Sequence, residues 1–264
     1  MTDLLVERDR GVVVLTLNRP ERRNAISAQM WAQLSVILRE VAQRPADRVL
    51  VLRGAGDCFS SGAEIGAGAN TEPPLTVMRR IGGVTTQLFN LPKPTVAAIN
   101  GVAYGAGANL AFACDFALAT KRSTFCEIFS RRAMSVDCGG SWLLPRLIGL
   151  RRAKELVFLA DVITAEQARD VGLIGSVVED CELAGATQAL ADRLADGPAL
   201  ALSLSKQLLQ DAAARTFEDA VEAESQAQVV NARGPDLREA VAAFRERRDP
   251  VFRPPGDPHP AVDC

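Results

Sequence analysis

A glycine-rich run in the middle of the chain has residue types that could stabilise negative charge on an oxygen. Gly105-Ala106-Gly107 lies between residues 99–104 and the apolar stretch 108–114, which predicts a strand, a tight turn and a helix start. Such a turn leaves backbone N–H groups unpaired at the positive end of a helix. Small residues around Gly62 allow a second close approach to the main chain. Two such donors brought together would form an oxyanion hole.

Other common catalytic centres are disfavoured by the residue types. The only histidine, His259, lies in a proline-rich stretch. Ser-His-Asp and Cys-His catalysis both need a histidine held firmly in a core, so we do not expect either. The six cysteines show no C-x-x-C spacing. We therefore expect reduced thiols, no metal site and no bound cofactor.

The composition indicates a globular protein with no strong field of one sign. The chain has 264 residues, 48% of them hydrophobic, and a formal net charge of −2. Nucleic-acid binding needs clustered Lys and Arg and is not expected. No apolar stretch approaches the ~20 residues of a membrane span, and the first 20 residues carry several charges. We expect a cytoplasmic protein that binds neither nucleic acid nor membrane.

Strand and helix patterns alternate over the first two thirds of the chain. Strands are predicted at 4–8, 11–17, 49–52, 95–99 and 116–119, and helices after Ser27, at 75–90 and from Ala108. Asp9-Arg10-Gly11 predicts a hairpin between the first two strands. A recurrence at roughly 45 residues indicates stacked βα units with mostly parallel strands, an α/β fold.

The last third of the chain is predicted to be helical. Helices are expected at 182–195, 198–214, 216–231 and 236–248, with Thr216 and Asp236 as N-caps and Glu239 completing a capping box with Asp236. Their apolar faces need a partner, which indicates an oligomerisation surface. The expected organisation is a core at 1–196, a helical oligomerisation segment at 197–253 and a disordered tail at 254–264.

Several ordered motifs resemble the crotonase, or enoyl-CoA hydratase/isomerase, family from about residue 4 to residue 253. The motifs are Leu17-Asn18-Arg19-Pro20, Arg23-Asn24-Ala25-Ile26-Ser27, Phe59-Ser60-Ser61-Gly62-Ala63-Glu64-Ile65, Asn100-Gly101, Tyr104-Gly105-Ala106-Gly107, Cys114-Asp115, Gly139-Gly140-Ser141-Trp142 through Gly149, Ala165-Glu166-Gln167-Ala168, Gly172-Leu173-Ile174 and Ala243-Phe244 near Arg247-Arg248.

The resemblance implies a spiral of ββα units with a C-terminal helical trimerisation segment. It implies a homotrimer or a dimer of trimers and an acyl-CoA thioester as ligand, with coenzyme A as part of the substrate. Ala63 and Ala106 align with the residues whose backbone N–H groups hold the thioester oxygen. The residues aligned along the CoA adenine and pantetheine are Arg23, Ala25, Ser61 and Ile65, although Ala25 and Ile65 could equally be ordinary core residues.

The catalytic glutamates of the family's hydratases are absent from this sequence. The ungapped register from Gly101 to Gly140 places Asn109 and Phe129 at their positions, and neither side chain can act as a general base. Glu127 is a substitute to consider. Glu127, however, lies two residues before Phe129. Its side chain would therefore be turned away from the Phe129 direction on a helix, or displaced along the chain on a strand.

Asp137 is the stronger candidate for a base. Its position resembles that of the single aspartate in family members that shift double bonds, including isomerases of phenylacetate pathways, although those usually have proline where Val136 stands. The structural alternative is that Asp137 caps a helix starting at Gly139. A largely apolar surrounding, with Tyr104, Phe129, Ala133 and Trp142 as its expected lining, would raise the pKa of this carboxyl by desolvation.

These residues predict an enoyl-CoA isomerase. Asp137 would remove a proton from C2 or C4 of the acyl chain and return it at the other carbon, while Ala63 and Ala106 stabilise the enolate. A hydratase of low activity that uses Asp137 or Glu127 alone is one alternative. A homologue that binds acyl-CoA without turning it over is another, because the family's glutamates are missing.

Overall fold

The computed structural model describes residues 2–64 and 72–252. Its strands are β1 (Leu4–Asp9), β2 (Val12–Leu17), β3 (Val49–Gly54), β4 (Cys58–Ser60), β5 (Thr95–Ile99), β6 (Val102–Tyr104), β7 (Phe116–Thr120), β8 (Thr124–Cys126), β9 (Ile163–Thr164) and β10 (Ser176–Val178). Its α-helices are α1 (Ala28–Gln43), α2 (Pro74–Phe89), α3 (Ala106–Phe112), α4 (Gly140–Ile148), α5 (Leu150–Leu159), α6 (Ala165–Asp170), α7 (Leu183–Ala195), α8 (Ala199–Asp211), α9 (Phe217–Arg233) and α10 (Pro235–Glu246). Short 3-10 helices are η1 (Pro20–Arg22), η2 (Ser130–Arg132) and η3 (Ala212–Ala214).

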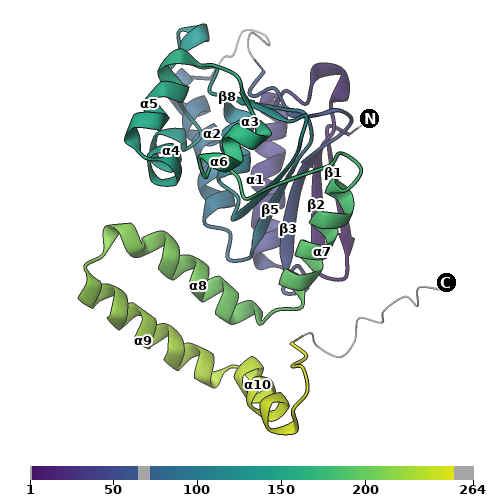
Figure 1. The fold of residues 1–264 in the computed structure, drawn as a ribbon, viewed down its shortest axis with the longest axis vertical. Helices are drawn as coiled ribbons and strands as arrows, with labels where there is room; N and C mark the ends of the chain where they lie inside the picture. The colour runs from purple at the N-terminus through teal and green to yellow at the C-terminus, as the bar shows by residue number, and fades with distance from the viewer. Residues whose placement is uncertain (1, 65–71, 253–264) are drawn as a thin grey trace, which may run out of the picture.

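The strands form two sheets, and from β3 to β8 successive strands alternate between them. The larger sheet has the order β1-β2-β3-β5-β7-β10 and is parallel except for the β1–β2 hairpin. The smaller sheet has the order β4-β6-β8-β9 and is parallel except for β8–β9. The chain thus repeats a strand of the large sheet, a strand of the small sheet and a helix, which confirms the predicted spiral of ββα units (Figure 1).

Both faces of the large sheet are buried, which explains why its central strands are apolar throughout. Leu50 and Leu52 of β3 pack in one cluster with the predicted apolar face of α1, which includes Trp31 and Leu34. Val49 and Val51 belong to a second cluster, on the opposite face, with residues of α7. The small sheet lies beside the large sheet. The two glycine-rich turns follow its strands β4 and β6.

Helix starts follow the predicted caps in two of three cases. Ser27 accepts a hydrogen bond from the Met30 N–H, and Thr216 caps α9, both as predicted. Asp236 is not an N-cap: α10 begins one residue earlier, after Gly234, with Pro235 in its first turn. Proline is well suited to that position because its fixed φ is helical. An N–H at the start of a helix has no intrahelical acceptor, so proline loses no hydrogen bond by lacking one. The helix expected from Ala108 begins at Ala106.

Helices α8, α9 and α10 project from the body of the molecule (Figure 1). Hydrogen bonds hold α8 to the body, from Lys206 to Asp115 and from Gln210 to the Phe89 carbonyl. The division at 1–196 and 197–253 stays a prediction, and the predicted tail at 254–264 lies outside the described residues.

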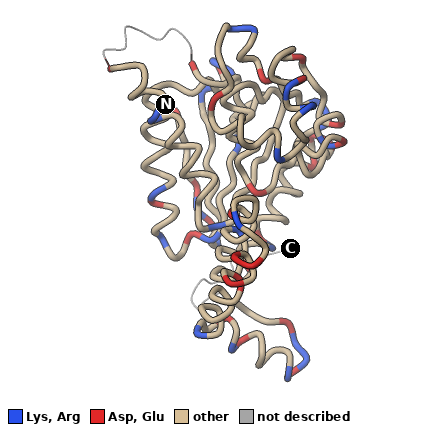
Figure 2. Tube along the Cα trace, turned by 90° about the vertical axis from the view of Figure 1, so that its left-hand side faces the viewer, with Lys and Arg blue, Asp and Glu red and all other residues tan. Residues whose placement is uncertain are grey.

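Charged residues of both signs are interspersed along the chain (Figure 2). Across residues 2–64 and 72–252, no helix is both long and apolar enough to cross a membrane.

Candidate active site

Two turns at the ends of neighbouring strands lie against each other. β4 and β6 are parallel partners, so the turns that follow them, at Gly62-Ala63 and Gly105-Ala106, leave the small sheet on the same edge. A Cβ built on Gly62 would lie 3.0 Å from the Tyr104 carbonyl oxygen and 3.6 Å from the Ala106 nitrogen. The main chain at Gly62 therefore lies close to the first residue of α3.

The N–H groups of Ala63 and Ala106 have no acceptor within the described part of the chain, whereas those of Gly62, Glu64 and Gly105 are bonded. The Glu64 N–H donates to the Ile26 carbonyl at 3.0 Å and the Gly105 N–H to the Cys126 carbonyl at 2.9 Å. Ala106 opens α3, where an N–H has no intrahelical acceptor. The positive φ of the turn, +51°, falls on Gly105 and not on Ala106, so the alanine methyl is accommodated.

An ion pair fixes the first of these turns. The Arg19 guanidinium donates to a Glu64 carboxylate oxygen and to the Ala25 carbonyl, both at 3.0 Å. The hydrogen bond from Arg19 lowers the pKa of Glu64. Glu64 is thus a structural anion next to Ala63.

The expected CoA-binding residues lie along the same turn. The Ser61 N–H donates to the Arg23 carbonyl at 2.9 Å, and the Ile26 N–H donates to the Gly62 carbonyl at 2.9 Å. Arg23 is exposed, while Ala25 and Ser61 are half-buried. The structure therefore brings Arg23, Ala25 and Ser61 beside Ala63, and Ile65 lies outside the described residues.

Asp137 is attached to α3 one helical turn after Ala106. Its carbonyl oxygen accepts hydrogen bonds from the Asn109 side-chain nitrogen and from the Gly140 N–H, each at 3.0 Å. Its carboxylate is half-buried, and within the described residues Oδ1 is buried without a hydrogen-bond partner. Burial raises the pKa of Asp137, an effect that the adjacent Cys138 thiol partly offsets. The helix-cap alternative is wrong, because α4 begins after Gly139 with no side-chain cap.

Glu127 lies in this site, contrary to the expectation that it would be turned away or displaced. It directly follows β8, and its Oε2 accepts a hydrogen bond from the Asn109 side chain at 3.3 Å. The residue is only 2% exposed. Burial raises its pKa to about 8, with a further contribution from the Asp137 charge. No strand was predicted at β8, which ends at the residue before Glu127.

The expected lining residues divide into two groups. A Cβ built on Gly105 would lie 3.6 Å from the Phe129 ring, so buried Phe129 packs at the turn. Tyr104 is half-buried, with its hydroxyl 3.3 Å from that of Thr124. Ala133 is exposed and has a left-handed backbone conformation at the end of η2. Trp142 of α4 packs against Phe89 of α2 and against the guanidinium of Arg146.

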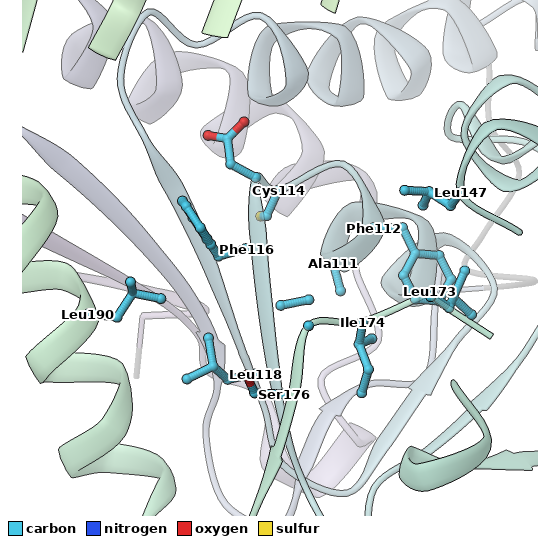
Figure 3. Close-up of a pocket in the computed structure, with 14 residues that line it drawn as sticks. Ala111, Phe112, Cys114, Phe116, Leu118, Leu147, Leu173, Ile174, Ser176 and Leu190 are labelled. Carbon is cyan, nitrogen blue, oxygen red and sulfur yellow. The ribbon is translucent and has the colours of Figure 1, made fainter. Parts of the chain in front are cut away.

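A separate cavity of about 520 Å³ lies at the other end of α3 (Figure 3). Ala111, Phe112 and Cys114 line it together with residues of β7 and Leu190, and it contains none of the predicted site residues. Among the described residues no group of three His, Cys, Asp or Glu side chains could hold a metal ion. The paired turns with the Asn109–Glu127–Asp137 cluster are therefore the candidate active site.

The chain is also clearly similar to known proteins. A family model described as enoyl-CoA hydratase/isomerase matches residues 7–255. The chain is 39% identical over 259 residues to the 1,2-epoxyphenylacetyl-CoA isomerase of Escherichia coli strain K12, covering 96% of this chain and 98% of that one. It is 32% identical to the crotonyl-CoA hydratase of Syntrophomonas wolfei, covering 95% and 97%. The crystal structure of an enoyl-CoA hydratase from Bacillus anthracis superposes with a TM-score of 0.91 at 31% identity, covering 95% and 99%. The chain therefore belongs to the enoyl-CoA hydratase/isomerase family.

Proposed function

We propose that this protein moves a carbon–carbon double bond in an enoyl-CoA. The thioester oxygen binds the N–H groups of Ala63 and Ala106, and the Asp137 carboxylate removes a proton from C2 of a 3-enoyl-CoA. The electron pair of that C–H bond moves into the conjugated enolate, whose charge the two N–H groups stabilise. Asp137 then returns the proton at C4, which yields the 2-enoyl-CoA. The reverse reaction starts from C4.

One observation carries this proposal: Asp137 Oδ1 is buried without a hydrogen-bond partner in the described residues, and the Asp137 carbonyl is bonded to Asn109 of the helix that begins at Ala106. No ion pair within the described residues neutralises it, and its raised pKa makes it a stronger base than an exposed aspartate. Asn109 and Phe129 supply no base at the positions where the family's hydratases have glutamate. A single carboxylate that takes and returns the same proton suits isomerisation better than addition of water.

Separate incubations with a 3-enoyl-CoA and a trans-2-enoyl-CoA test the assignment, with products followed by NMR. We expect interconversion of the two enoyl-CoAs. Asp137→Asn should lower kcat by at least ~100-fold, because general-base catalysis contributes about that much or more. Binding of a saturated acyl-CoA should change little.

Two outcomes would contradict the isomerase assignment. Fast hydration of the 2-enoyl-CoA without isomerisation would favour the hydratase alternative, for which the nearness of Glu127 to Asp137 is the supporting observation. Tight acyl-CoA binding, with no turnover and no effect of Asp137→Ala in either assay, would favour the non-catalytic homologue.

We also propose that the acyl-CoA enzyme is a homotrimer or a dimer of trimers assembled through residues 197–253. Large apolar side chains exposed on α9 and α10, such as Phe217 and Phe244, support this assembly.

A further inference from the structure

The side-chain amide of Asn109 links Glu127 and Asp137 in the candidate active site. Asn109 is fully buried, and its side-chain nitrogen donates to Glu127 Oε2 at 3.3 Å and to the Asp137 carbonyl at 3.0 Å. Both amide hydrogens are thereby used. Asn109 Oδ1, Glu127 Oε1 and Asp137 Oδ1 are buried with no partner in the described residues. The cluster has more acceptors than donors, so an additional proton would stabilise it.

The surroundings of Glu127 disfavour its charged form. No Lys or Arg side chain forms an ion pair with it in residues 2–64 and 72–252, and its one hydrogen-bond donor is the neutral Asn109 amide. The titratable groups near it are the Asp137 carboxylate on the segment before α4 and the Cys138 and Cys126 thiols. None of these supplies a positive charge. A buried carboxylate without a counter-ion takes up a proton.

The backbone that carries Asp137 depends on the Asn109 contact. Cys138 and Gly139, the two residues after Asp137, both have left-handed φ angles, +48° and +77°. A non-glycine residue in this region is strained and persists only where surrounding contacts hold it. Asn109 supplies such a contact from α3. The approach is close, since a Cβ built on Gly140 would lie 2.6 Å from the Asn109 side-chain nitrogen.

We propose that Glu127 and Asn109 form a positioning pair for Asp137. Uncharged Glu127 accepts one hydrogen bond from Asn109 and so directs the other to the Asp137 carbonyl. The base is thereby fixed relative to α3, which also presents the Ala106 N–H. This role rests on the proposed isomerase function, in which Asp137 is the base. Neither Glu127 nor Asn109 needs to touch the substrate.

Matched substitutions at Glu127 separate positioning from packing. Glu127→Gln keeps an uncharged acceptor for the Asn109 amide, whereas Glu127→Leu removes the acceptor at similar size. We expect the Gln variant to keep kcat within a few-fold of wild type. The Leu variant should lose up to about 100-fold in kcat, since small displacements of a catalytic group have effects of that size. KM should change little in either, and Asn109→Leu should resemble Glu127→Leu.

The pH dependence of kcat gives a readout that packing alone would not move. The pKa of Glu127 is raised to about 8, so wild type carries the uncharged form below that pH. Above it, ionised Glu127 would repel the Asp137 carboxylate and disrupt the cluster, and kcat should fall. Glu127→Gln cannot ionise, so its kcat should stay level through the same range.

Several outcomes would overturn the pair. Wild-type kcat in Glu127→Leu would exclude positioning, and an equal loss in Glu127→Gln would show that the acidic proton itself is needed. A fall above pH 8 that persists in Glu127→Gln would also contradict it. A wild type that does not isomerise, with Asp137→Asn unchanged, would instead refute the proposed function. The pair can still be tested then by NMR titration of the carbon-13-labelled Asp137 carboxyl, whose pKa should move in Glu127→Leu and stay near wild type in Glu127→Gln.

Discussion

Asn109 shows how an amide side chain can serve an acidic site without adding charge. The side chain is fully buried and donates to two oxygens, one of Glu127 and one of Asp137. A glutamate at this position would place a third carboxylate beside Glu127 and Asp137, with no positive side chain paired to either in the described residues. An asparagine at this position therefore avoids a third buried negative charge next to Glu127 and Asp137.

The Ala106 N–H can be removed with little change to the fold. Ala106→Pro deletes this one donor at the first position of α3, where proline is favoured. We expect kcat for isomerisation to fall by roughly 100- to 1,000-fold, because one oxyanion donor has about that effect. Steady-state kinetics with a 3-enoyl-CoA measure the loss, and circular dichroism checks that the helix content is kept.

Ala106→Gly is the matched control because it retains the N–H. It should keep kcat within a few-fold and lower the free energy of unfolding by at most about 1 kcal/mol, the usual difference between alanine and glycine in a helix. Equal activity in the proline and glycine variants would show that this N–H does not bind the thioester oxygen.

Local patterns in the sequence were enough to find the two turns but not the inward direction of Glu127. The glycine runs predicted the turns, and their close approach follows from β4 and β6 being parallel neighbours. The position of Glu127 was inferred from helix and strand periodicity relative to Phe129. In the structure β8 ends at Cys126, so neither periodicity applies to the following residue. Its contact with Asn109 joins residues 18 positions apart, which local patterns do not report.

At the scale of elements, the contact of α3 with β4 depends on a glycine. A Cβ built on Gly107 would lie 2.6 Å from Ser60 Cβ and 2.8 Å from the Ser60 carbonyl oxygen. Gly107→Ala should force the helix away from β4, with a loss of about 1–3 kcal/mol in unfolding free energy, typical of overpacking. It should also lower kcat, because α3 carries Ala106 and Asn109. Chemical denaturation and steady-state kinetics measure the two effects.

Gly82 on α2 is the control for this substitution. A Cβ built there meets no atom within 4 Å. Gly82→Ala should therefore leave kcat unchanged and raise the free energy of unfolding by about 0.5–1 kcal/mol, since alanine is the better helix former. A Gly107→Ala variant as stable as Gly82→Ala would contradict the close approach of α3 and β4.

Most elements could be predicted because their hydrophobic periodicity is local. The α1 face of Met30, Trp31 and Leu34 and the fully buried β5 are recognisable without knowledge of their partners. The strands of the small sheet were harder, because β4, β6 and β8 have three residues each and show no period. Their pairing depends on contacts between distant segments.

At the scale of the whole molecule, the helices beyond α7 are unlike the body. The body buries both faces of its large sheet, whereas Phe217 of α9 is 80% exposed and Phe244 of α10 is 84% exposed. A cavity of about 720 Å³, with Trp142 and Leu209 in its lining, lies between α8 and the body. Large apolar side chains exposed together on neighbouring helices are typical of an interface with another chain.

Phe244→Asp should therefore dissociate the assembly. We expect wild type to have a mass three or six times the 28.2 kDa of the chain in light scattering after size exclusion. A charge at a buried interface position should weaken association by about 2 kcal/mol or more at each contact and shift the protein toward monomer. Val36→Asp is the control, since Val36 is an apolar residue of α1 that is 57% exposed on the body. A monomeric wild type, or equal dissociation in both variants, would place no subunit interface on α10.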